Sequence, residues 1–361
     1  MKKPSRLLRS LSSRLPTRLA PSPAVAPWPP VRSAYDRWLA AELRADPLAP
    51  CTSAAWLDRA LGLAVAAQRR LVSSSSAAAS TAAGIDRKTV DECVDDTAEL
   101  LDACASLRDR LDMLRSYVAA TRVALHWLEG GGGAAHRRAA AAFAECEAVE
   151  RRCGAELAKC GSGLRKLGER ALLHAGKHPA AAGGDEALSG ARGVALLAVG
   201  ALGAALAFRP RRAVSGVSVS GGKAVAQWEC ALQEVQRHVR EEYERRRKDG
   251  VPCMAELDAA AAAALAVKCS VASGRRCSET AIAAARRRCD ELEETVLAFE
   301  ERIGELRRAL IDVRMVLMEW AQSARGPEPL RLACNAGQET HVGSETSCPR
   351  ILRSQKHDNI C

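Results

Sequence analysis

The sequence predicts an all-α fold, an antiparallel bundle of long heptad-patterned helices with disordered N- and C-terminal tails. Two long stretches carry apolar residues at spacings that alternate between three and four, as on a helix that buries one face. Alanine, the strongest helix former, fills much of the 48% hydrophobic content, whereas aromatic residues make up only 3%. The two ends of the chain show no such periodicity.

We divide the chain into three parts. Residues 1–34 form a basic, Ser/Pro-rich segment that is either disordered or a targeting signal, since it has no acid and its prolines exclude a long helix. Residues 35–322 form the helical domain. Residues 323–361 form a disordered tail, because no apolar period continues beyond Gly326.

Helical patterning begins near residues 35–43 and resumes at Trp56, Leu57, Leu61 and Val65. A Ser/Ala-rich linker at residues 73–84 then precedes the next helix. From Thr97 that helix carries the first long seam, made of Leu100, Cys104, Leu107, Leu111, Leu114, Val118, Thr121, Leu125 and Leu128.

Four glycines at residues 130–133 end this helix and predict a tight joint. A second helix follows at about Ala134–Lys159. Its apolar side consists of Phe143, Cys146, Val149, Cys153, Leu157 and Cys160. We expect these two helices to form an antiparallel αα-hairpin.

Residues 176–191 are predicted to be a loop leading to an uncharged stretch at residues 193–208, which arginines flank. As a helix this stretch would span roughly 24 Å, against the roughly 30 Å hydrocarbon core of a bilayer. Gly200 and Ala204 present small residues for close helix contact. The sequence leaves open a transmembrane helix, a buried bundle helix and a shallow membrane contact.

Three more helices are predicted after residue 222. The first carries a stripe from Val225 to Tyr243 and ends at residues 248–252, and the second is alanine-rich and begins near Met254. The last has the longest seam, made of Cys289, Leu292, Val296, Phe299, Ile303, Leu306, Leu310, Val313, Leu317 and Trp320. We expect the seams at 97–128 and 289–320 to be buried inside one bundle, with an external coiled-coil partner as the lesser alternative.

No recognisable catalytic, cofactor-binding or metal-binding site is present, so we predict that the protein is not an enzyme and uses no cofactor. The 14 cysteines include no C-x-x-C, and the stripe Cys146, Cys153 and Cys160 is best explained by packing, with a thiol metal or redox site as the rival. His174 and His178 lack a metal-protease frame, and SGGKA at 220–224 lacks the residues of a phosphate loop. Carboxylates on polar helix faces are expected to be solvated, namely Glu241, Glu242, Glu293 and Glu294.

The net charge of +10 favours contact with anionic lipid over nucleic acid, since the basic residues are not interleaved with aromatics. We therefore expect protein partners bound through helix faces, membrane contact through 193–208, and neither nucleic acid nor a small-molecule substrate. The predicted location is at a membrane with the bulk in the cytosol, single-pass if 193–208 spans the bilayer. A plastid or another organelle, reached through residues 1–33, is the alternative.

Several segments resemble the plant BYPASS family and the related exocyst-subunit interactors, over roughly residues 35–322. Lys88, Asp91, Asp95 and Leu100-Leu101-Asp102, followed by Cys104, are similar to that family's core block, although Thr89 and Cys93 replace its Trp and Tyr. The helix opened by Trp56-Leu57 and the segments 224–242 and 254–259 also resemble it. The resemblance implies a non-enzymatic, membrane-associated regulator or scaffold of root and shoot development that restrains a mobile signal; a membrane-tethered trafficking component contacting the exocyst is the alternative.

Overall fold

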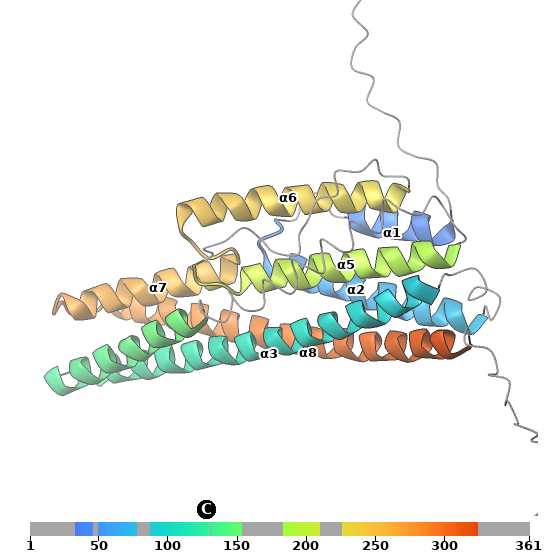
Figure 1. Ribbon diagram of the computed structural model, residues 1–361. Coiled ribbons are helices and arrows are strands. Elements are labelled where there is room, and N and C mark those ends of the chain that lie inside the picture. Colours follow the sequence, from blue (N-terminus) through green and yellow to red (C-terminus); the bar gives the residue numbers. More distant parts are fainter. Residues whose placement is uncertain are drawn as a thin grey trace, which may run out of the picture. The chain divides into compact units, whose positions relative to one another are not determined.

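The computed structural model describes residues 33–45, 50–77, 87–130, 132–153, 183–209 and 226–323 (Figure 1). Within these residues the chain forms helices and no strand, which confirms the all-α prediction. The helices are α1 (Ala34–Arg44), α2 (Ala54–Ala77), α3 (Arg87–Glu129), an unlabelled helix over residues 133–153, α5 (Gly183–Ala205), α6 (Gln227–Asp249), α7 (Ala255–Ala272) and α8 (Glu279–Ser323). The tails predicted at 1–34 and 323–361 lie almost wholly outside the described residues.

The two longest helices, α3 and α8, pack against each other in antiparallel orientation. Along α3 from Val94 to Glu129, the bonded partners on α8 run backwards from Arg314 to Arg286. Both predicted seams are buried, apart from a partly exposed last residue in each, and Leu306 and Leu310 have no exposed surface. The prediction that the seams are buried inside a single bundle is therefore confirmed.

The predicted αα-hairpin is also present. Gly132 has a φ of +90°, a conformation that glycine adopts without strain, and the chain reverses there. The helix over residues 133–153 then returns along α3, so that the Cys146 thiol lies 3.4 Å from the Thr121 hydroxyl. Its buried side is Ala135, Ala139, Phe143, Cys146, Val149 and Cys153.

Other neighbouring helices run parallel, so the bundle mixes orientations. Arg302 of α8 donates two hydrogen bonds to the Asp58 carboxylate near the start of α2, at 3.0 and 3.1 Å. Further along both helices, Leu71 shares a buried cluster with Val313 and Leu317. Residue numbers therefore rise together on α2 and α8.

A polar clamp joins the first two helices to α6 and α7. The Glu256 carboxylate accepts hydrogen bonds from the Ala54 backbone N–H, at 3.0 and 3.1 Å, and so satisfies a free donor at the start of α2. Asp36 accepts from the Trp228 N–H at 2.8 Å, near the start of α6. The Tyr243 hydroxyl donates to the Cys51 carbonyl at 3.2 Å. Glu256 lies in a segment that carried the family resemblance, and this capping contact gives it a structural role.

Two predicted boundaries are wrong. α5 begins at Gly183, inside the predicted loop at 176–191, because Ala187, Leu188 and Ala191 are buried and this burial outweighs the low helix propensity of its glycines. α2 continues to Ala77, into the predicted linker.

Two glycines of α5 allow other helices to approach closely. A Cβ at Gly190 would lie 2.7 Å from the Tyr35 ring and 3.0 Å from a Leu39 methyl group. At Gly193 it would lie 2.8 Å from a Leu232 methyl group. The small residues that permit close packing of α1 and α6 on α5 are therefore these two, and not only the predicted pair Gly200 and Ala204.

Replacing Gly190 with Ala should lower the free energy of unfolding by about 1–3 kcal/mol, because the added methyl overlaps the buried Tyr35 ring. Gly62→Ala is the matched control, since its Cβ would meet nothing closer than 3.8 Å. That change should raise stability by about 0.5–1 kcal/mol through helix propensity. Urea unfolding of the full chain measures both, and equal effects of the two substitutions would refute the close approach.

Candidate functional site

The uncharged stretch of α5 lies at the centre of the bundle. Every residue from Val194 to Phe208 is buried except Ala204, which is partly exposed. Figure 1 shows α5 between α6 on one side and α2 and α3 on the other. α5 is therefore a core helix of the described fold.

By length and composition, the 20 residues Glu186–Ala205 could also cross a membrane. However, 78% of the apolar window is buried against the rest of the structure. Buried core helices of soluble proteins pass the same test, so this property is weak evidence for a span. Of the alternatives left open by the sequence, the structure displays the buried bundle helix.

Polar side chains satisfy the backbone carbonyls at the C-terminal end of α5. The Arg110 guanidinium, only 2% exposed, donates to the Gly203 carbonyl at 2.7 Å. The Cys153 thiol donates to the Leu206 carbonyl at 3.4 Å. The last carbonyls of a helix have no partner in the helix itself, and a cation there also meets the negative end of the helix dipole. Arg110 of α3 thus both donates to a terminal carbonyl of α5 and places a positive charge at the negative end of its dipole.

The N-terminal half of α5 is held by an ion pair and an amide. Arg192 lies 2.6 Å from the Asp96 carboxylate, and the two side chains are 14% and 3% exposed. The Gln68 side-chain amide donates to the Ala191 carbonyl at 3.0 Å. These contacts connect α5 to α3 and to α2.

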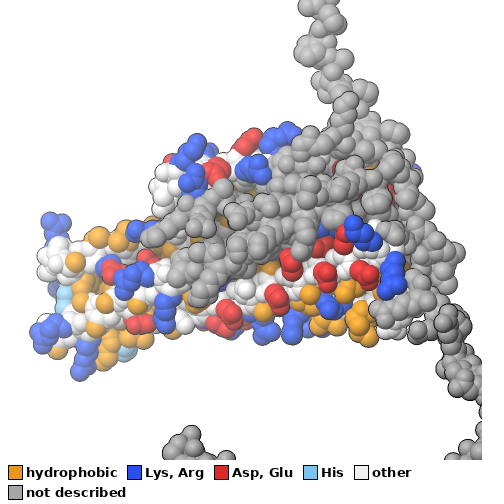
Figure 2. Space-filling view, in the orientation of Figure 1, with side chains coloured by type: hydrophobic (Ala, Val, Ile, Leu, Met, Phe, Trp, Pro, Cys, Tyr) orange, Lys and Arg blue, Asp and Glu red, His pale blue; other side chains and the backbone are white. Residues whose placement is uncertain are grey.

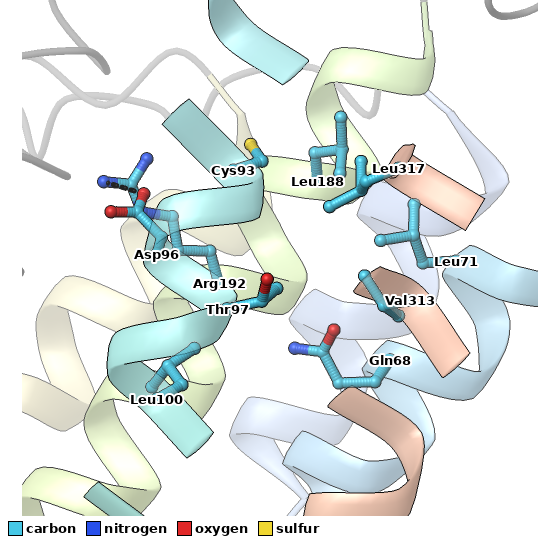
Figure 3. Close-up of a pocket in the computed structure, with 10 residues that line it drawn as sticks. All are labelled: Gln68, Leu71, Cys93, Asp96, Thr97, Leu100, Leu188, Arg192, Val313 and Leu317. Atoms are coloured by element: carbon cyan, nitrogen blue, oxygen red, sulfur yellow. Dashed lines mark ion pairs between the residues drawn. The ribbon is translucent and has the colours of Figure 1, made fainter. Parts of the chain in front are cut away.

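A small cavity lies beside this ion pair, between α2, α3, α5 and α8. Figure 3 shows Asp96 and Arg192 pointing toward each other on one side of it, with Leu71, Val313 and Leu317 on the other. Its volume of about 20 Å³ has room for about one water molecule. Ligand pockets are usually roughly 300–1,000 Å³, so this cavity does not fit a substrate.

Asp96 and Arg110 belong to a second buried stripe that the sequence analysis missed. The stripe repeats every seven residues along α3, and its two charged members contact α5, Asp96 through Arg192 and Arg110 through Gly203. Its members are Asp96, Ala103, Arg110, Tyr117 and Ala124. The sequence contains that spacing, but two of the five positions are charged, and charged residues were assigned to the solvated face.

The cysteines of the described core are packed as small hydrophobic residues. Burial raises the pKa of Cys51, Cys253 and Cys289 to about 12, and it also raises the pKa of Cys146 and Cys153. The thiols are therefore protonated at neutral pH, a state in which they are poor nucleophiles. Cys160, the third member of the predicted stripe, lies outside the described residues.

No group of three or more His, Cys, Asp or Glu side chains within the described ranges could hold a metal ion. His174, His178 and the segment 220–224 lie outside those ranges. Glu241 and Glu294 are exposed, as expected. Glu293 pairs with Arg122 but its side chain is still 40% exposed, whereas Glu242 pairs with Arg245 and is 19% exposed, so the expected solvation is wrong for Glu242.

The comparison with protein families identifies one relationship. The family model described as Protein BPS1 matches residues 67–318, which covers most of the helical bundle from α2 to α8. No match to the chain was found among the curated proteins or among the solved structures.

Asp96→Ala should lower the free energy of unfolding by about 3 kcal/mol, because it leaves the largely buried Arg192 without its counter-ion. The double variant Asp96→Leu with Arg192→Met should lose less, since no charge is then left behind. Urea unfolding measures both. A loss below about 1 kcal/mol for Asp96→Ala would contradict a structural role for the pair.

Iodoacetamide at pH 8 should modify Cys269 first among the described cysteines, because its side chain is exposed. Cys51, Cys253 and Cys289 should react only after unfolding, since they are buried and their pKa values lie near 12. Peptide mapping by mass spectrometry after timed labelling gives the order. Rapid labelling of any of these three in the folded protein would argue for a reactive thiol site.

Proposed function

Because the chain belongs to the BPS1 family, we propose that it is a helical regulator and scaffold of plant development that acts by binding other proteins rather than by catalysis. Family membership supports the developmental role. Binding as the mechanism is our proposal, and it is supported by a surface of α8 that the bundle leaves open.

That surface is an outward apolar stripe on the C-terminal half of α8, formed by Ile311, Met315 and Met318. The three side chains are 40%, 55% and 40% exposed, and their spacing of four and three places them on one face of the helix. Figure 2 shows hydrophobic side chains gathered over this part of the molecule. Methionine adapts to differently shaped partners. We propose an amphipathic helix of another protein as the occupant.

We propose that membrane association is peripheral, with α5 remaining inside the bundle. Removing α5 would expose the apolar residues of α2 and α3 that cover it, and would leave Arg110 and Asp96 without their contacts at Gly203 and Arg192. A single span through α5 is the alternative. Contact with the exocyst, and an organellar location through residues 1–33, stay predictions that no observation on the described residues favours.

The double variant Ile311→Glu with Met315→Glu tests the stripe. The unchanged chain and the variant are each expressed in a plant whose own copy of this protein has been removed. Cross-linking should place a partner helix on α8 of the unchanged chain. The variant should lose that partner and fail to restore normal growth, because carboxylates cannot be buried in an apolar contact.

The matched control replaces two similarly exposed residues elsewhere, Leu265→Glu with Leu297→Glu, which are 55% and 52% exposed. It should retain both the partner and normal growth. Circular dichroism verifies that both variants fold. Normal growth with the α8 variant would refute this contact face.

Carbonate extraction at alkaline pH distinguishes the two modes of membrane association. A peripheral protein should be released completely into the supernatant, because its contacts are electrostatic and α5 stays covered. A known single-span protein in the same membranes serves as the control. Retention in the pellet, with release only by detergent, would show that α5 spans the bilayer.

A further inference from the structure

Two helix turns meet at one end of the bundle. One joins α3 to the helix over residues 133–153, and the other joins α7 to α8 (Figure 1). Arg286 of α8 pairs with Glu129 at the end of α3, at 2.7 Å. Lys268 of α7 pairs with Glu147 of the helix over residues 133–153. These contacts place both turns, which include residues 132–138 and 272–288, at the same end of the bundle.

The charge at this end is strongly one-sided. The two segments contain seven arginines and a single acid, Glu279. We call these arginines the basic end, and all of them are exposed: Arg137, Arg138, Arg275, Arg276, Arg286, Arg287 and Arg288. Figure 2 shows Lys and Arg side chains at the extremity of the space-filling view that corresponds to these turns.

Only part of this charge is neutralised by neighbouring acids. Arg286 and Arg288 form ion pairs with Glu129 and Glu291. Arg138 lies over the Trp127 ring, 4.5 Å from its centroid. The other four arginines are exposed at the same end of the bundle, so a surplus of positive charge faces outward.

We propose that the basic end binds the surface of a membrane that contains anionic lipids. Arginine donates hydrogen bonds to phosphate in a bidentate geometry, and clustered basic residues are attracted to anionic bilayers. Because the arginines lie at the same end of the bundle, one extended charged surface can contact side chains from both turns. Trp127, held beside Arg138, has the mixed polar and apolar character suited to the bilayer interface.

A nucleic acid fits this surface less well. Single strands are usually held by several stacking aromatic side chains along a basic groove. Among the described residues next to the basic end, the aromatic rings are Trp127, His126 and His136, and Trp127 already stacks with Arg138. A lipid-binding basic end rests on the proposed peripheral membrane association, and it specifies the surface and the lipid class.

The test uses the full-length protein and extruded vesicles made either of phosphatidylcholine alone or of phosphatidylcholine with 30% phosphatidylserine, a composition chosen at roughly the level of anionic membranes. The unchanged protein should sediment with the anionic vesicles at least about tenfold more strongly than with the neutral ones. Raising the salt should release it, because screening weakens exposed charges. Soluble glycerophosphoserine should not compete, since one headgroup cannot replace a charged plane.

The decisive variant is Arg275→Gln, Arg276→Gln and Arg287→Gln, which should weaken binding to the anionic vesicles at least about tenfold. The matched control is Arg69→Gln, Arg108→Gln and Arg237→Gln, which removes the same charge from exposed positions on α2, α3 and α6. It should bind within about twofold of the unchanged protein if location rather than net charge matters. Thermal melting followed by circular dichroism verifies folding of both.

Equal weakening by both variants, or no preference for anionic vesicles, would overturn the proposal. So would tighter binding to a DNA duplex that is lost in the basic-end variant while vesicles are ignored. Partner capture through the α8 stripe is measured on the unchanged protein alongside vesicle binding. An unchanged protein that captures its partner but binds no anionic vesicles would refute the lipid surface and leave the scaffold function standing. An unchanged protein that binds anionic vesicles but captures no partner through α8 would refute the scaffold function and leave the lipid surface standing.

Discussion

The burial of α5 is the constraint on which the rest of the structure depends. Its stretch from Val194 to Phe208 carries no charge, and each large apolar side chain withdrawn from water contributes about 1.5–3 kcal/mol. The other helices supply what this burial requires. Arg110 and Cys153 satisfy its terminal carbonyls, and the glycines at 190 and 193 let α1 and α6 approach. α3, which supplies Arg110, is itself packed along α8 from Val94 to Glu129.

The same composition explains why α5 is open to two interpretations. A charge-free, alanine- and glycine-rich helix suits both a bilayer and a crowded protein core, because both environments exclude water and reward close backbone approach. The polar contacts at its two ends favour the core. Asp96 with Arg192, and Arg110 with Gly203, are complementary only when α5 lies between α2 and α3. This leaves contact with the outside to the remaining surfaces, which are the α8 stripe and the basic end.

The seams of α3 and α8 were predictable from the sequence because apolar residues recur at alternating spacings of three and four. The spacing holds whether the position is Leu, Val, Cys or Phe. The hairpin at residues 130–133 was predictable because its glycines mark the turn. The position of α5 was not, since composition alone does not separate lipid from core. The start of α5 at Gly183 depends on tertiary burial of Leu188. The sequence analysis missed the structural contacts of Asp96, Arg110 and Glu256 because each partner is distant in the sequence. The separation is 93 residues for Arg110 and Gly203 and 202 residues for Glu256 and Ala54.

Hydrogen exchange of the full-length protein in detergent-free buffer tests the burial of α5 most directly. The backbone amides of residues 194–205 should exchange as slowly as those of the buried seam of α3, through global unfolding alone. Exchange as fast as that of the exposed helix ends would contradict the account. So would a chain that stays in solution only with detergent and gains protection in α5 when bilayers are added.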